Sequence, residues 1–164
     1  MTYYDKIANG YDELHREEQE KKMQIIQDLI KPKKHESLLD IGCGTGISME
    51  PWDCKKIGID PSEELLKQNP FETKKAEAES LPFEDSSFDY VTCVSSIHNF
   101  RDIDKAIEEI KRVAKDKIII TILRKSPKFD KIRDLIQANF DTIKIVLEEK
   151  DVLFLLENFP EKSE

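Results

Sequence analysis

The sequence predicts an α/β fold: a Rossmann-like sheet of about seven strands, mostly parallel with a C-terminal antiparallel hairpin, with helices on both faces. Three observations predict it. Helical and strand-like segments alternate along the chain, a glycine-rich turn follows the first apolar strand at 38–41, and two strand-like segments flank the polar turn 149–151. Alternating units of this kind use right-handed crossovers and bind ligands beyond the carboxyl ends of the strands.

The first half of the chain predicts a long helix and three strands. Met23, Ile26 and Ile30 recur at helical spacing before Pro32, which indicates a helix over 17–30. Short apolar runs indicate two strands, and a charged segment suits a sheet edge, where lysine discourages pairing with other chains. The predicted strands are 38–41, 56–60 and, at the edge, 73–78, with a helix start at 61–64.

The second half of the chain predicts two more helices and the closing strands. Residues 117–123 form a continuous, mostly β-branched run, which is typical of a strand buried on both faces. Ser126 and Pro127 match the N-cap and first position of a helix. The other predicted elements are a central strand 88–94, a helix with an apolar stripe over 103–114, and hairpin strands 142–147 and 152–156.

Length and charge restrict the class of protein. The chain of 164 residues suits one domain, 1–164, and no apolar run reaches the ~18 to 20 residues of a membrane span. The start of the chain lacks the pattern of a signal peptide, so we expect a cytoplasmic protein. A net charge of −8 argues against strong general nucleic-acid binding. The three scattered cysteines predict no metal site.

The sharpest functional feature is the turn Asp40–Gly46, which reads Asp-Ile-Gly-Cys-Gly-Thr-Gly. Glycines at alternate positions permit a tight turn and let a ligand approach the backbone. A dinucleotide fingerprint would need glycine at position 47, where the chain has Ile47, and no P-loop Gly-Lys-Ser/Thr follows. The turn therefore suits a nucleoside without a pyrophosphate.

This turn resembles the first motif of the class I S-adenosylmethionine-dependent methyltransferases, which reads acid-x-Gly-x-Gly-x-Gly after the first strand. The resemblance extends over roughly residues 3–123. Its other matching segments, in the family's order, are Gly58–Ser62, Ala76–Phe83 and Ser87–Val91. The resemblance implies S-adenosyl-L-methionine as the cofactor and methyl transfer as the activity.

The resemblance also implies which residues contact the cofactor. Asp60 follows Gly42 by 18 positions, near the ~20 expected for an acid that accepts hydrogen bonds from ribose hydroxyls. Glu77, where the family more often has Asp, is expected at the adenine amine with the Ala78 amide near the ring. Asp40 is expected to reach the methionine end through water or backbone. The full expected set is Tyr11, Asp40, Gly42, Cys43, Gly44, Gly46, Asp60, Pro61, Glu77, Ala78 and Ser95.

The N-terminal segment 3–12 resembles the Tyr-Asp-x-x-Ala-x-x-Tyr-Asp lead-in of methyltransferases related to ubiquinone and menaquinone biosynthesis. In those enzymes the lead-in folds over the cofactor. The resemblance therefore implies an N-terminal lid within residues 1–22, with Tyr11 in its roof, whose closure would exclude water. Packing of Tyr11 at a helix edge is the alternative.

Residues 95–100 follow the fourth predicted strand, where related enzymes line the gap between cofactor and acceptor. His98 in this segment is the candidate catalytic base. Methyl transfer from a sulfonium is an in-line displacement on an activated carbon, so alignment alone can supply most of the acceleration. A hydrogen-bonded wall residue is therefore the alternative role of His98.

Three functions follow from these patterns. The leading one is methyl transfer to an unidentified acceptor, with a small molecule preferred because of the N-terminal lead-in. The first alternative is a methyltransferase acting on tRNA, rRNA or a translation protein, helped by a small activator that pairs with the edge near 73–78. A non-catalytic protein that binds S-adenosylmethionine and regulates or scaffolds is the second. The expected partner protein is that activator or a second copy in a homodimer.

Overall fold

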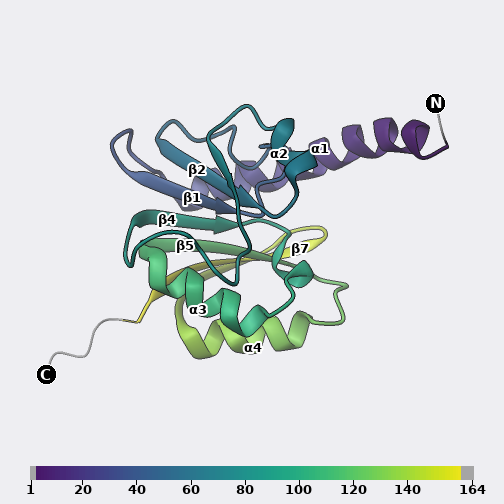
Figure 1. The fold of residues 1–164 in the computed structure, drawn as a ribbon. Coiled ribbons are helices and arrows are strands. Elements are labelled where there is room, and N and C mark those ends of the chain that lie inside the picture. Colours follow the sequence, from purple (N-terminus) through teal and green to yellow (C-terminus); the bar gives the residue numbers. More distant parts are fainter. Residues whose placement is uncertain (1–2, 160–164) are drawn as a thin grey trace, which may run out of the picture.

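A computed structural model describes residues 3–159, and the side chains of residues 13–159. The strands form one sheet in the order β3-β2-β1-β4-β5-β7-β6 (Figure 1). The strands are β1 (Ser37–Ile41), β2 (Lys55–Asp60), β3 (Thr73–Lys75), β4 (Phe88–Cys93), β5 (Ala114–Leu123), β6 (Phe140–Leu147) and β7 (Asp151–Asn158). The helices are α1 (Tyr3–Leu29), α2 (Glu63–Lys67), the 3-10 helix η1 (Ile97–Asn99), α3 (Ile103–Val113) and α4 (Phe129–Asn139).

The strand pairing creates a crevice at the carboxyl end of the sheet. β1 pairs in parallel with both β2 and β4, and the chain proceeds from β2 to one edge and from β4 toward the other. Strand order therefore reverses between β1 and β4, which is where open α/β sheets bind ligands. β7 is antiparallel to its neighbours β5 and β6. The predicted Rossmann-like class, with its C-terminal antiparallel hairpin, is confirmed.

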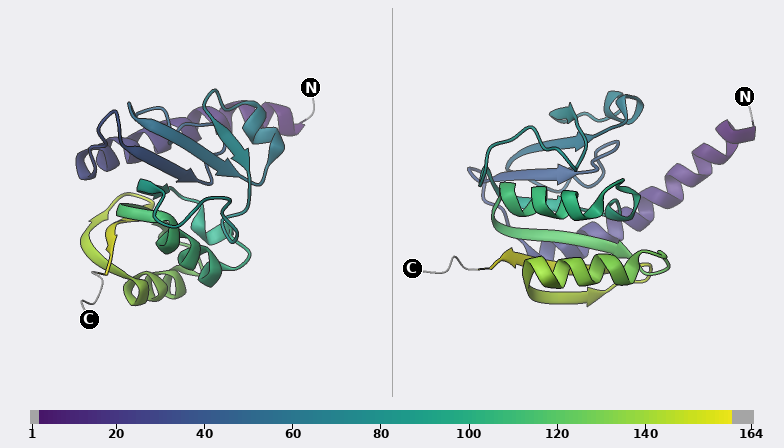
Figure 2. Two further views of the ribbon diagram at one scale, coloured as in Figure 1. Left: turned by 60° about the vertical axis from the view of Figure 1, so that its left-hand side comes forward. Right: turned by 60° about the horizontal axis from the view of Figure 1, so that its bottom comes forward.

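Both faces of the sheet are covered, with α3 and α4 on one side and α1 on the other (Figure 2). Consecutive residues of β5 point to opposite faces, so Ile118 packs with the α3 and α4 side chains whereas Ile119 packs with α1. The α1 face is built from Met23, Ile26, Ile30, Leu38, Trp52, Tyr90, Val94, Ile119, Leu153 and Leu155. α1 thus seals one face, while its first half extends away from the sheet.

The structure corrects several predicted boundaries. β3 ends at Lys75 rather than at residue 78, and the chain turns there toward the ligand crevice. Ser126 does not cap α4: its carbonyl accepts the Phe129 N–H at 3.1 Å in a preceding turn, and the helix starts at Phe129. α1 is much longer than 17–30 and has no break at residue 22. No helix among the described residues is long and apolar enough to cross a membrane.

Candidate functional site

Two neighbouring cavities lie at the carboxyl edge of the sheet. The first encloses about 380 Å³ and the second about 430 Å³. The first is lined by Ile41, Gly42, Ile59, Asp60, Pro61, Leu65, Glu77, Ala78, Glu79, Ser96, Asn99, Phe100 and Arg101. The second is lined by His15, Gln19, Gly42, Cys43, Gly44, Thr45, Ile47, Ser48, Asp60, Leu65, Val94, Ser95, Ser96, His98 and Asn99. Five residues line both, so the cavities are two compartments of one crevice.

The glycine-rich turn separates the two compartments. The N–H groups of Gly42 and Cys43 both donate to the Ile59 carbonyl, at 2.9 and 3.0 Å, which ties the turn to the end of β2. Gly42 has φ +76°, and a Cβ atom there would lie 2.4 Å from the Ser96 hydroxyl oxygen. Only glycine fits this position, because both the backbone conformation and the close approach of Ser96 exclude a side chain.

Asp60 lies between the two cavities and is 8% exposed. One carboxylate oxygen accepts the Gly44 N–H at 3.1 Å, and the other accepts the Ser62 N–H at 2.9 Å. These bonds hold the carboxylate in one orientation. Each oxygen still has a lone pair that can accept a second hydrogen bond, so the group suits a ligand with adjacent hydroxyls.

Asp40 is completely buried and lines neither cavity. Its carboxylate accepts hydrogen bonds from the Thr92 hydroxyl, at 2.7 Å, and from the Ser48 hydroxyl. Burial raises the pKa of Asp40 to about 6, although both hydroxyl bonds favour the charged form. The side chain therefore ties the end of β1 to β4 and to Ser48, which follows the glycine-rich turn and lines the second cavity.

Glu77 and Ala78 line the first cavity. The half-exposed Glu77 carboxylate pairs with the Arg101 guanidinium at 2.7 Å, and Arg101 lines the same cavity. Glu79 is buried and accepts the Asp102 N–H at 3.2 Å. These two contacts tie the loop after β3 to the segment between η1 and α3, which closes the first cavity on that side.

Three further predicted residues, Cys43, Ser95 and His98, also line the second cavity. Ser95 has φ +54°, and its N–H donates to the Thr121 hydroxyl at 2.7 Å. A non-glycine residue in this region costs free energy, which the surrounding hydrogen bonds offset. Burial, then the negative charge of Asp40, raises the pKa of the Cys43 thiol to about 12, so this cysteine stays uncharged at neutral pH.

The Nδ1 atom of His98 is buried and has no hydrogen-bond partner among the residues that the structure describes. Burial lowers the pKa of this imidazole, Asp151 opposes the shift, and Lys128 and Lys22 add to it. The imidazole is therefore neutral at neutral pH, which is the form that can accept a proton.

The remaining predicted residues differ in whether they line a cavity. Pro61 lines the first cavity and Gly44 the second, whereas Gly46 shapes the turn at φ +100° and lines neither. The Tyr11 side chain, and with it the predicted lid roof, lies outside the described side chains. Within residues 13–159, no group of three or more His, Cys, Asp or Glu could hold a metal ion.

Sequence reasoning missed several residues of the crevice. Ser96, Asn99 and Phe100 belong to the segment 95–100 that the resemblance had marked, so their presence was within reach. His15 and Gln19 of α1 also line the second cavity; Gln19 lies within the predicted helix, whereas His15 precedes the predicted start at residue 17. No local pattern distinguishes such residues from an exposed helix face.

Comparison with known sequences shows which family this chain belongs to. Residues 39–121 match the family described as a methyltransferase domain. An uncharacterised protein of Methanocaldococcus jannaschii is 32% identical over 157 residues, covering 90% of this chain and 61% of that protein. The demethylmenaquinone methyltransferase of Thermotoga maritima is 30% identical over 141 residues, covering 77% and 62%. The chain thus spans about three fifths of the length of these two relatives.

Solved structures share the fold at low sequence identity. A Pyrococcus horikoshii protein superposes with a TM-score of 0.75 at 19% identity, covering 88% of this chain and 91% of that one. A Haloferax volcanii protein, solved as a complex with the Trm112 methyltransferase activator, superposes with a TM-score of 0.74 at 14% identity, covering 93% and 94%. Both likenesses cover most of this chain.

Proposed function

We propose that this chain, which belongs to the methyltransferase-domain family, transfers a methyl group from S-adenosylmethionine to a small-molecule acceptor. The observation that carries the proposal is the orientation of Asp60. Two backbone N–H groups hold its carboxylate between two compartments, beside the glycine-rich turn. In S-adenosylmethionine the ribose joins the adenine to the methionine part that carries the methyl group. A carboxylate that binds the ribose between two compartments would therefore place the adenine in one and the reacting group in the other.

The first cavity fits the adenosine part of this donor. Ile41, Ile59 and Leu65 supply apolar walls for a base, and Asp60 supplies acceptors for ribose hydroxyls. The Glu77 carboxylate faces the same space and could accept from the adenine amine while it pairs with Arg101. The methionine part would extend past Gly42 and Gly44 into the second cavity.

The sulfonium group supplies a methyl carbon that is already activated for displacement. The chain therefore has to align the acceptor with that carbon and keep water away. The second cavity provides uncharged polar groups for this task from α1, the glycine-rich turn and η1. Holding the acceptor in line is the main catalytic contribution expected of these side chains.

A small acceptor is favoured by the size of the second cavity and by the net charge of −8. Similarity to the demethylmenaquinone methyltransferase of Thermotoga maritima supports the same class. The first alternative acceptor is an RNA or a translation protein. It is supported by the Haloferax neighbour, which was solved with an activator, and by β3, a three-residue strand at the open edge of the sheet.

Titration calorimetry tests the donor. We expect S-adenosylmethionine to bind and NAD not to bind. Asp60→Ala should weaken S-adenosylmethionine binding by ~1.5 to 3 kcal/mol for each hydrogen bond lost. The matched control is Asp53→Ala, because the Asp53 side chain is 86% exposed and lines neither of the two cavities. Binding of NAD with none of S-adenosylmethionine would refute the proposal.

Incubation with methyl-labelled S-adenosylmethionine and fractionated cell extract tests the acceptor. Label in a small-molecule or lipid fraction supports the proposed class. Label in RNA or protein supports the alternative acceptor, and salt-sensitive tRNA binding would strengthen it. Tight binding of the donor without transfer to any fraction would indicate a regulatory or scaffold protein instead.

A further inference from the structure

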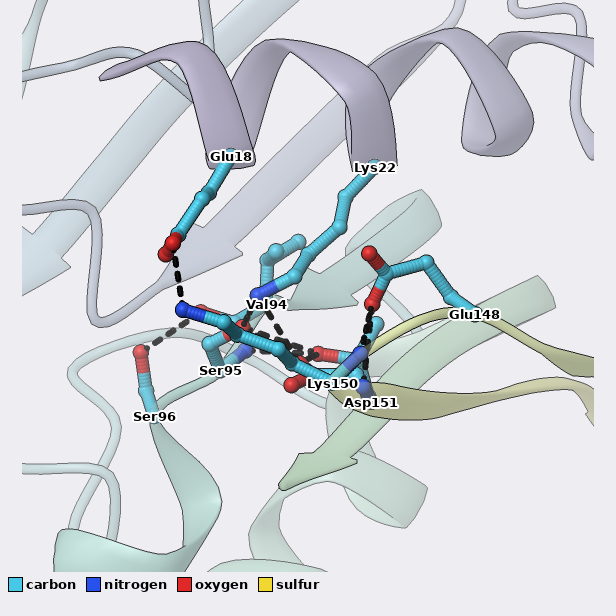
Figure 3. A network of polar contacts seen from close by, with 9 residues as sticks. Glu18, Lys22, Val94, Ser95, Ser96, Glu148, Lys150 and Asp151 are labelled. Atoms are coloured by element: carbon cyan, nitrogen blue, oxygen red, sulfur yellow. Dashed lines mark hydrogen bonds and ion pairs between the residues drawn. The ribbon is translucent and has the colours of Figure 1, made fainter. Parts of the chain in front are cut away.

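A buried polar cluster lies at the carboxyl ends of β4 and β5 (Figure 3), and one of its residues, Ser95, lines the second cavity. It joins Lys22 of α1, Ser95 after β4, Thr121 of β5 and Asp151 at the start of β7. Lys22 Nζ lies 3.2 Å from Asp151 Oδ2 and donates to Ser95 Oγ at 2.9 Å. The hydroxyls of Ser95 and Thr121 donate to the same Asp151 oxygen, at 2.6 and 3.0 Å.

The three donors converge on one oxygen of Asp151 and leave the other without a partner. Asp151 is fully buried, and its Oδ1 atom makes no hydrogen bond within the described part of the chain. The Nδ1 atom of His98 is likewise buried and unpartnered. A buried polar atom in this state costs ~1 to 3 kcal/mol, so two such atoms need an explanation.

The two unpartnered atoms are chemically complementary. A carboxylate oxygen only accepts hydrogen bonds, whereas Nδ1 of a neutral imidazole donates when it carries the proton. The two residues belong to neighbouring segments, because Ser95, three positions before His98, donates to Asp151 at 2.6 Å, and the Asp151 charge acts to raise the pKa of His98. A hydrogen bond between Nδ1–H and Oδ1, formed directly or through one bound water, would satisfy both atoms.

We propose that Asp151 positions His98 with its proton on Nδ1, so that Nε2 accepts a proton from the methyl acceptor. This inference rests on the proposed function and specifies the acceptor as a molecule methylated at an O–H or N–H group. The acceptor oxygen or nitrogen bonds to the methyl carbon while the carbon–sulfur bond breaks and leaves its electron pair on sulfur. The acceptor proton moves to Nε2 and then to solvent.

The surrounding charges suit this role. Lys22 neutralises the buried Asp151 carboxylate from α1, and Lys128, which precedes α4, donates to the His98 carbonyl at 3.3 Å. Burial lowers the pKa of His98, and Asp151 limits the lowering against the two lysines. The imidazole therefore stays neutral near pH 7 and gains a carboxylate partner that stabilises it once it is protonated.

The first test is an NMR titration of the His98 ring in the full chain, with ¹⁵N shifts to identify the protonated nitrogen. The wild-type protein should show Nδ1–H. Asp151→Asn should move the His98 titration to lower pH and populate the Nε2–H form. The control is Asp141→Asn on β6, where the side chain is exposed and should leave His98 unchanged.

Because Asp151→Asn leaves Lys22 buried without its anion, the double variant Lys22→Met, Asp151→Asn keeps the test usable if the single variant fails to fold. It should show the same change of His98 tautomer. An unchanged tautomer and titration in whichever variant folds would overturn the pairing.

The second test uses methyl-labelled S-adenosylmethionine with the extract fraction that accepts label. His98→Gln should slow transfer about a hundredfold or more, and Asp151→Asn at least about tenfold. Calorimetry on both variants separates transfer from donor affinity: slower transfer with donor binding retained supports the proposal, whereas a loss of transfer explained by an equal loss of donor affinity would overturn it. Products labelled on carbon would overturn the acceptor class. Absent donor binding in the wild type would refute the methyltransferase function itself, while the NMR result would still report on the pairing.

Discussion

Lys22 and Asp151 form a buried ion pair, with 3.2 Å between the ammonium and the carboxylate, that joins the first helix to the last strand of the sheet. The side chains are only 4% and 0% exposed. Removing one partner of such a pair leaves an uncompensated buried charge, whereas removing both does not. Both residues of the pair also bond to Ser95, which lines the second cavity, so the packing of α1 affects the geometry of that cavity.

The pair predicts a non-additive effect on stability. Lys22→Met should lower the free energy of unfolding by about 3 to 5 kcal/mol, because the Asp151 charge remains buried. The double variant Lys22→Met, Asp151→Asn should lose clearly less than the sum of the single variants. Urea unfolding of all four proteins measures the coupling. Additive losses would show that the two side chains act independently.

Asp40 predicts a specific dependence of stability on pH. Burial raises the pKa of Asp40 to about 6 in the folded chain, so the protonated carboxyl favours the folded state over the unfolded one. This stabilisation is complete near pH 4 and is lost as the pH rises through 6. Asp40→Asn should therefore be more stable than wild type by about 2 to 3 kcal/mol at pH 8, and by little near pH 4. Urea unfolding at both pH values measures the difference. The same difference at both pH values would contradict the assignment.

Gly42 predicts separable effects of backbone strain and steric contact. Gly42→Ala should destabilise the fold and weaken S-adenosylmethionine binding, since its Cβ meets Ser96. Gly44→Ala is the matched variant: φ is also positive, at +50°, but the nearest atom is 4.0 Å away, so only a strain of ~1 to 3 kcal/mol is expected. Ser96→Gly should partly rescue Gly42→Ala. Thermal unfolding and calorimetry measure both effects, and equal losses in the two alanine variants would remove the role of Ser96.

Glu77 and Arg101 predict a change in binding with little change in stability. Both side chains are substantially exposed, at 51% and 77%, so breaking their ion pair should cost at most about 1 kcal/mol of folding. Glu77→Ala should nevertheless weaken S-adenosylmethionine binding by ~1.5 to 3 kcal/mol if its carboxylate accepts from the adenine amine. Calorimetry with each variant measures this. Unchanged affinity would remove Glu77 from the proposed site.

Much of the fold could be predicted because it depends on local patterns. The alternation of helical and strand-like segments predicted the order of elements. The β-branched run 117–123, which lies within β5, predicted a strand buried on both faces. The motif residues of the crevice were found because they sit at strand ends, where a parallel sheet gathers them. Boundaries were less accurate: α4 starts after Ser126 and Pro127 because those residues form a separate turn.

The sequence by itself determined the Rossmann-like class, the glycine-rich turn and the position of Asp60, because periodicity and conformational constraint act over short stretches of chain. Only the tertiary structure decided that Lys22 is buried against Asp151 and that the buried Nδ1 atom of His98 has no partner within the described part of the chain. Lys22 and Asp151 are 129 positions apart and look like ordinary surface charges in sequence. Their roles follow from packing of α1 and β7 at one end of the sheet, which no local pattern encodes.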